Sequence, residues 1–153
     1  MGGELSEEKD APPSFLFAAM KDPLGANLDR LQIVKGWIEN EEMKEKVFNV
    51  AWSDDRQLDD EGNVAPVGDT VNLDEATWTD TIGDAALVGI WSDPECDPSE
   101  AAVYYARVLQ IPTPRWTLYD KVRFGIKDMD EEIPLVTQER VYSFPIWYKP
   151  KKS

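Results

Sequence analysis

The stretch that most constrains the fold of this chain is residues 101–116, with the sequence AAVYYARVLQIPTPRW. Its β-branched and aromatic residues from position 103 to position 111 predict a strand. Apolar side chains occur on both faces of this strand, so we expect it to be central in a sheet and covered on both sides. Pro112 and Pro114 have no N–H to donate, and they therefore end the strand.

Four other segments are also predicted to be strands, because apolar side chains dominate or alternate along them. They are residues 14–20, 28–39, 44–52 and 86–91. The polar connection at residues 40–43 is short, which is typical of an antiparallel hairpin between the two runs that it joins.

Two further segments have weaker strand signals, residues 71–73 and residues 138–148. Pro145 interrupts the second of these, which indicates a bulge or an edge position. Residues 117–124 are polar and aromatic and are compatible with a helical turn. The total is about seven short strands with little helix, joined by turns rich in Pro, Asp and Gly, and this pattern predicts a mainly β fold. The specific expectation is an antiparallel β-sandwich, immunoglobulin-like in general type, with long acidic loops.

The length of 153 residues is that of one domain. We expect a flexible lead-in at residues 1–13, which contain two Gly, two Pro and a run of charges. The β-sandwich then occupies residues 14–150, and residues 151–153 form a basic tail. The start of the chain does not resemble a signal peptide, and no apolar run approaches the roughly 20 residues of a membrane span. The sequence leaves the cellular compartment open.

Charge and composition exclude several function classes. The formal net charge of −14 disfavours nucleic acid and anionic membranes as partners. The absence of His removes His-based acid–base catalysis, the Ser-His-Asp triad and nearly all zinc sites. Cys96 lies between acids, which weaken it as a nucleophile. We therefore predict no catalytic residue, no metal ligand and no cofactor within this chain.

One acidic turn contains residues of the kind that bind a metal ion. Asp93, Glu95 and Asp97 alternate along it and could gather a hard cation such as Ca²⁺. Three acids in a loop more often face water, so the sequence does not decide whether these residues bind a cation.

The best candidate for an interaction surface is the segment that ends in Arg115 and Trp116. The preceding prolines hold the backbone extended, and Arg and Trp are residues that anchor interfaces. Arg also pairs bidentately with carboxylate or phosphate groups. In the alternative interpretation, Trp116 caps the sandwich and Arg115 pairs with one of the protein's own acids.

Other aromatic residues have structural interpretations beside functional ones. The six Trp residues could form a sugar-stacking platform. Core packing explains those that lie in predicted strands, which are Trp37, Trp52, Trp91 and Trp147. Tyr104 or Tyr105 could donate its hydroxyl hydrogen to the backbone in a tyrosine corner, or simply pack with the hydroxyl at the rim of the core.

Three stretches resemble the C-terminal region of the DUF3604 family, a bacterial family of uncharacterised function. They are residues 22–37 together with 45–53, residues 102–116, and residues 139–148. The resemblance covers essentially the whole chain, and the long motifs are specific.

This resemblance implies that the chain belongs to a larger protein. Full-length members are several times longer, and their upstream part looks like a PHP-type metal-dependent phosphoesterase with a His-containing metal motif. No metal ligand carries over to this chain, which has no His. The resemblance therefore implies a non-catalytic C-terminal β-sandwich, a fragment or a truncated gene product, whose partner is the upstream catalytic domain and whose substrate is unknown. The alternative is a free-standing binding module for carbohydrate or for a protein partner.

Overall fold

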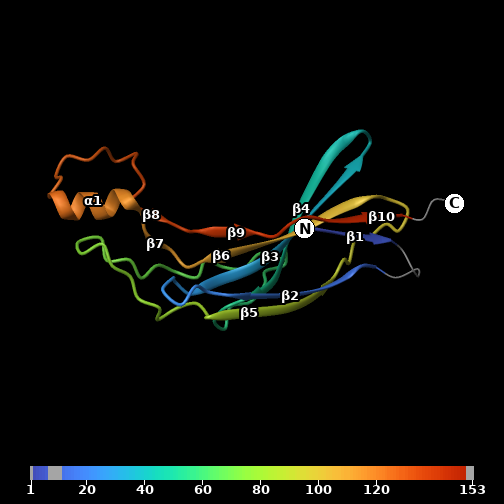
Figure 1. The fold of residues 1–153 in the computed structure, drawn as a ribbon, viewed down its shortest axis with the longest axis horizontal. Helices are drawn as coiled ribbons and strands as arrows, with labels where there is room; N and C mark the ends of the chain where they lie inside the picture. The colour runs from blue at the N-terminus through green and yellow to red at the C-terminus, as the bar shows by residue number, and fades with distance from the viewer. Residues whose placement is uncertain (1, 7–11, 151–153) are drawn as a thin grey trace.

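The computed structural model of the chain describes residues 2–6 and 12–150. It consists largely of strands with one short helix, which confirms the predicted mainly β class (Figure 1). In chain order the elements are β1 (Gly3–Ser6), β2 (Ser14–Met20), β3 (Leu28–Glu39), β4 (Glu42–Trp52), β5 (Ala86–Ser92), β6 (Ala102–Gln110), β7 (Thr113–Pro114), α1 (Trp116–Phe124), β8 (Val136–Thr137), β9 (Arg140–Tyr142) and β10 (Ile146–Lys149).

The larger sheet, called the wide sheet below, has β6 in its middle. Its strand order is β1-β10-β6-β3-β4, and β9 also pairs with β6. The pairs within it are antiparallel except β1 with β10, which is parallel. The position of β6 between β3 and the two short strands confirms the central place expected for the strand in residues 101–116. The cover expected on both sides is incomplete, because Val103, Tyr105 and Arg107 on one face are only partly buried.

A second, narrower layer covers one face of this sheet. It is the antiparallel pair β2–β5, which lies below β3 and β6 in Figure 1. The ring centroids of Phe15 and Tyr104 are 5.0 Å apart, and those of Phe48 and Trp91 are 4.9 Å apart, so aromatic packing joins the two layers. The buried residues between them form two clusters: Phe15, Ile33, Ala102, Tyr104 and Tyr148, and then Leu28, Leu31, Leu87 and Val108.

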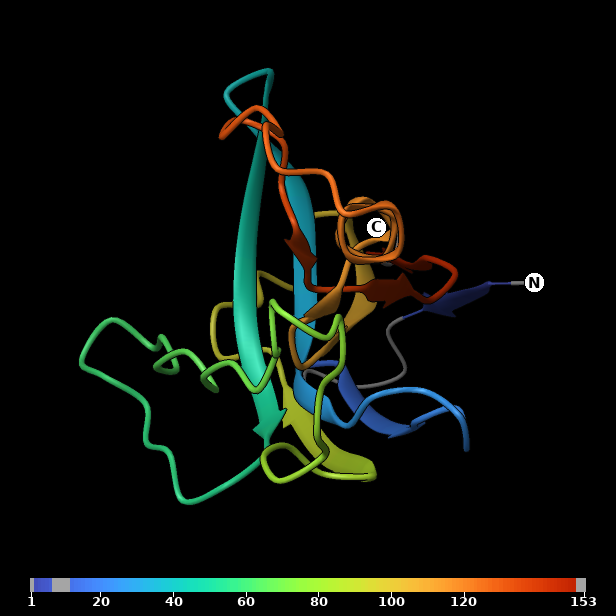
Figure 2. The ribbon, with the colours of Figure 1, turned by 90° about the vertical axis from the view of Figure 1, so that its left-hand side faces the viewer.

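The hairpin of β3 and β4 is longer than predicted. β4 begins at Glu42, inside the expected polar turn at residues 40–43. Asn40 and Glu41 both have positive φ angles, 51° and 66°, which is the backbone geometry of a two-residue hairpin turn. The tip of this hairpin projects away from the rest of the molecule in Figures 1 and 2.

β1 was not predicted. It lies within the residues 1–13 that were expected to form a flexible lead-in, and it pairs in parallel with β10. An ion pair between Glu4 and Lys149, at 2.8 Å, joins the same two strands. The strand is four residues long and depends on a partner from the other end of the chain, so no local pattern indicates it. Residues 1, 7–11 and 151–153, which include the basic tail, lie outside the described residues.

Of two expectations about short segments, one is wrong and one is confirmed. The strand predicted at residues 71–73 is wrong, because only an isolated bridge between Asn72 and Thr77 forms there. The Asn72 side chain instead accepts main-chain hydrogen bonds from the two residues at positions 74 and 75 and closes a turn. The interruption expected at Pro145 is confirmed, since it separates β9 from β10.

The helical turn allowed at residues 117–124 is a nine-residue helix, α1. It ends at Gly125, whose φ of 62° is the left-handed conformation that commonly follows a helix. Leu118 is fully buried, whereas most of the helix surface is exposed. In Figure 1, α1 and the loop after it lie at the opposite end of the long axis from β10.

Candidate functional site

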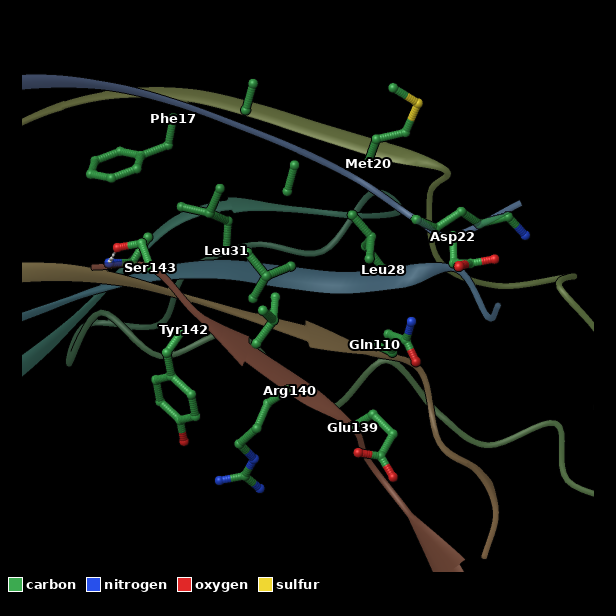
Figure 3. A pocket seen from close by; sticks show the side chains of 16 residues that line it. Phe17, Met20, Asp22, Leu28, Leu31, Gln110, Glu139, Arg140, Tyr142 and Ser143 are labelled. Atoms are coloured by element: carbon green, nitrogen blue, oxygen red, sulfur yellow. Dashed lines mark hydrogen bonds between the residues drawn. The ribbon is translucent and has the colours of Figure 1, made fainter. Parts of the chain in front are cut away.

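A cleft lies between β2 and the strands β6 and β9, where the narrow layer stops short of the edge of the wide one (Figure 3). Its volume is about 520 Å³, which is within the range of about 300–1,000 Å³ typical of ligand sites. Apolar side chains from the four strands β2, β3, β6 and β9 make its floor: Phe17, Leu28, Leu31, Ala106, Val108 and Val141. A floor of this kind favours binding of an apolar group.

Polar groups border one end of this cleft. Asp22 follows β2, Glu139 precedes β9, and Gln110 lies at the same end (Figure 3). Both carboxylates are exposed to solvent. The Arg140 and Tyr142 side chains point away from the cavity. The cleft can therefore recognise a ligand that combines apolar side chains with a cationic group.

A buried ion pair lies at the far end of the core. Lys35 Nζ is 2.6 Å from Asp93 Oδ2, and the Tyr104 hydroxyl donates to the same oxygen at 2.7 Å. Lys35 also donates to the main-chain oxygen of Glu95. Burial, and then the hydrogen bond to Asp93, raise the pKa of Tyr104 above its ordinary value. The cluster is closed to solvent and attaches the loop after β5 to the wide sheet.

The three acidic residues considered as a cation site, Asp93, Glu95 and Asp97, each have a different partner. Asp93 is buried in the cluster just described, while Glu95 forms an ion pair with Lys46. Asp97 accepts hydrogen bonds from the main chain and the hydroxyl of Ser99. Within residues 2–6 and 12–150, no group of His, Cys, Asp and Glu side chains is arranged to hold a metal ion.

A second buried charge, Asp29, joins three separate segments and was missed by sequence reasoning. Its Oδ2 accepts hydrogen bonds from Arg30 Nε at 2.9 Å and from Gln138 Nε2 at 2.8 Å. Arg56 Nη1 lies 2.8 Å from Oδ1, as an ion pair without hydrogen-bond alignment, and Arg56 Nη2 donates to the Asp29 carbonyl. The one signal in the sequence is an Asp-Arg pair near the start of a largely apolar strand.

The predicted interaction residues lie side by side at the start of α1. Trp116 is 65% exposed and does not cap the core. The Arg115 N–H donates to the Leu135 carbonyl, and no ion pair joins the Arg115 side chain to an acid in the part of the chain that the structure describes. The geometry leaves both side chains at the surface, and their contact with a partner stays a prediction.

One of the strand tryptophans departs from the expected core position. Trp37, Trp52 and Trp91 are partly buried, but Trp147 is 54% exposed. It borders a second cavity of about 370 Å³ on the face of the wide sheet turned away from β2 and β5. Tyr104 also differs from the tyrosine-corner expectation, because its hydroxyl binds a carboxylate and not the backbone.

The narrow layer has an apolar surface on its solvent side as well. Cross-strand pairs there are Leu16 with Ile90, Ala18 with Val88, and Met20 with Ala86. We call these six residues the outer face. Leu16, Met20, Val88 and Ile90 are 71%, 80%, 65% and 78% exposed. The sequence signal was present, since both runs are apolar without alternation, which is typical of strands covered on both sides.

Comparison with known proteins gives one family. The family model described as "Protein of unknown function (DUF3604)" matches residues 1–150. No curated protein and no solved structure matches the chain. The described residues also include no helix with the length and apolar character needed to cross a membrane.

Proposed function

The chain belongs to the DUF3604 family, and from this premise we propose that it is a non-catalytic module that packs against the metal-dependent hydrolytic part of a larger protein. In this proposal it is the C-terminal part of that protein, and its partner is the upstream catalytic domain. The outer face of β2 and β5 is the observation that carries the proposal.

The outer face is unusual for a surface that meets water. Complete burial of one large aliphatic side chain stabilises a protein by about 1.5–3 kcal/mol. The four large residues of this face are mostly exposed, so most of this stabilisation is absent in the chain alone. They form a contiguous patch because their positions alternate along two paired strands. Large contiguous apolar patches mark interaction sites, and the proposal assigns this one to contact with another layer of protein.

The unequal width of the layers supports the same interpretation. In this proposal, the wide sheet and the facing two-stranded sheet are an immunoglobulin-like sandwich whose second layer is completed by another part of the protein. Packing of further polypeptide on the outer face would cover the narrow layer on both sides. The upstream part of full-length family members resembles PHP-type phosphoesterases, and this likeness gives the further polypeptide its proposed chemistry, with divalent metal held by histidines that this chain lacks.

The carbohydrate-binding alternative would use exposed Trp147 as a stacking platform. Sugar recognition also needs several hydrogen-bonding groups around the ring. Among the described residues that line the cavity beside Trp147, Glu41 alone has a charged side chain, and the others are mainly apolar. The outer face therefore favours the packing module over the sugar-binding module.

Three measurements test the proposal. The chain should hydrolyse no phosphate ester with added Mn²⁺ or Zn²⁺, and turnover that persists through repurification would overturn it. The open reading frame that contains this sequence should encode an upstream His-containing metal motif. In that longer protein, Leu16→Ser with Ile90→Thr should make the junction more sensitive to proteolysis, whereas the matched pair Leu24→Ser with Leu73→Thr, on exposed loops, should not.

A further inference from the structure

The free edge of β2 presents unpaired main-chain groups. The Lys21 N–H donates to Ala85 O at 2.9 Å, and the Asp93 N–H donates to Pro13 O at 3.3 Å. Hydrogen-bonded and non-hydrogen-bonded pairs alternate along an antiparallel ladder, so the odd-numbered residues of β2 bond to β5. The N–H and C=O groups of Leu16, Ala18 and Met20 therefore point away from β5.

No hydrogen-bond partner for these groups occurs among the described residues, and those of Ala18 and Met20 border the cleft. The lining of the cleft includes Ala18 and Met20. The Met20 side chain points away from the cavity in Figure 3, so the main chain of this residue forms the border. An edge strand with free N–H and C=O groups is a template for pairing with another strand. Here the template lies beside an apolar floor.

We propose that this cleft binds an extended peptide segment of another protein as a third strand beside β2. Such a strand alongside residues 16–20 covers about 17 Å, at about 3.3 Å per residue. Its alternate side chains would point to the floor formed by Leu31, Val108 and Val141. Main-chain pairing gives affinity in this mode of recognition, and the pockets for alternate side chains give selectivity.

Charge defines the chemistry of the segment further. Asp22 and Glu139 border the end of the cleft where β2 ends, from opposite sides, and both are exposed. Lys21 also lines the cleft, but its ammonium group is paired with Asp80. The whole chain has a net charge of −14, which attracts cationic partners. The segment therefore has alternating apolar residues and a Lys or Arg beside these two carboxylates. The inference does not rest on the proposed packing function, because the outer face and the free edge are different surfaces of β2.

Two synthetic peptides test the inference on the intact chain. Acetyl-Lys-Val-Thr-Val-Thr-Val-amide places its cation near Asp22 if it binds antiparallel to β2, and acetyl-Val-Thr-Val-Thr-Val-Lys-amide does so if it binds parallel. One of them should shift the NMR amide signals of Leu16 and Ala18 in a saturable manner and slow their hydrogen exchange. Replacement of its Lys by Asp should weaken binding.

Variants separate the cleft from the rest of the surface. Ala18→Pro removes an N–H that no strand of the structure uses, and an edge strand tolerates proline there. It should lower peptide affinity about tenfold, through the lost hydrogen bond and the altered edge. Asp22→Asn with Glu139→Gln should lower it about two- to fivefold, as for an exposed ion pair. Ile90→Ser, on the outer face but on β5, is the matched control and should leave the affinity unchanged.

A second blocking variant keeps the test decisive if Ala18→Pro does not fold. Val141 is 64% exposed at the cleft, so Val141→Lys should fold and obstruct the peptide. The inference is overturned by a folded chain whose β2 amides respond to neither peptide at millimolar concentration. Binding that persists in both blocking variants also overturns it. So does sedimentation showing that the chain alone dimerises through the β2 edge, since a second copy would then be the occupant.

Discussion

The Tyr104 hydroxyl donates a hydrogen bond to Asp93 Oδ2 across 2.7 Å, and both side chains are almost completely buried. The same oxygen lies 2.6 Å from Lys35 Nζ. A cation, an anion and a neutral donor therefore meet at one point in the core. Two strands of the wide sheet, β3 and β6, are attached in this way to the loop that follows β5, so the cluster couples local loop structure to the stability of the whole fold.

Removal of the anion should be costly. Asp93→Asn leaves Lys35 buried without a carboxylate, and the loss of one partner of a buried pair lowers the free energy of unfolding by about 3–5 kcal/mol. Urea denaturation followed by Trp fluorescence measures the change. Glu95→Gln is the control, because its exposed pair with Lys46 contributes about 1 kcal/mol or less. Equal effects of the two substitutions would contradict the structural role given to Asp93.

Alkaline pH should destabilise the protein through Tyr104. Its pKa is raised in the folded state by burial and by the hydrogen bond to Asp93, whereas a Tyr in the unfolded chain titrates near 10. The unfolded state therefore loses this proton first. Stability from Tyr104 is fully present below about pH 10 and is lost as the pH rises from there toward the folded-state pKa.

Urea titrations between about pH 9 and pH 11 measure this dependence. Tyr104→Phe should show a smaller fall in unfolding free energy over that range, although it starts from a lower value because Asp93 loses a donor. Tyr119→Phe, at a position 44% exposed, is the control and should retain the wild-type slope. A wild-type slope in Tyr104→Phe would show that another group causes the alkaline loss.

The main strands could be predicted from the sequence because each has its own apolar pattern. The predicted bounds 14–20 and 28–39 agree with β2 and β3. α1 was harder to predict, since Trp, Thr, Tyr, Val and Phe have modest helix propensity and only Gly125 marks its end. β1 could not be predicted because its partner lies at the other end of the chain.

The candidate sites were predictable only in part. The prominence of Arg115 and Trp116 came from residue type, and the structure adds that both lie at the start of an exposed helix. The cleft beside β2 has no local signature, because it arises from the unequal widths of two sheets. The pair of Lys35 with Asp93 was hidden for a similar reason, since tertiary packing alone brings β3 to the loop after β5.

Gly83 should tolerate no side chain. Its φ is 75°, and an added Cβ would lie 2.6 Å from Ile111 Cγ2 and 2.9 Å from Leu28 O. Gly83→Ala should lower the unfolding free energy by about 1–2 kcal/mol for the backbone conformation and by about 1–3 kcal/mol more for the crowding. Gly62→Ala is a matched control, with a φ of 79° and no atom within 4 Å of the added carbon. Thermal unfolding should therefore show a clearly larger loss at Gly83 than at Gly62.

Substitutions of two residues in the first turn of α1 should have very different effects on stability. Trp116 is 65% exposed, so Trp116→Ala should change the unfolding free energy by about 0.5 kcal/mol or less. Leu118 is fully buried two residues later, and Leu118→Ala should cost about 2–5 kcal/mol in urea denaturation. A large loss for Trp116→Ala would show that this side chain belongs to the core. A small loss would show that the fold is retained, and Trp116→Ala combined with Arg115→Ala then tests whether α1 contacts the rest of a longer protein. In that longer protein the double variant should increase proteolysis at the junction between this module and the upstream domain.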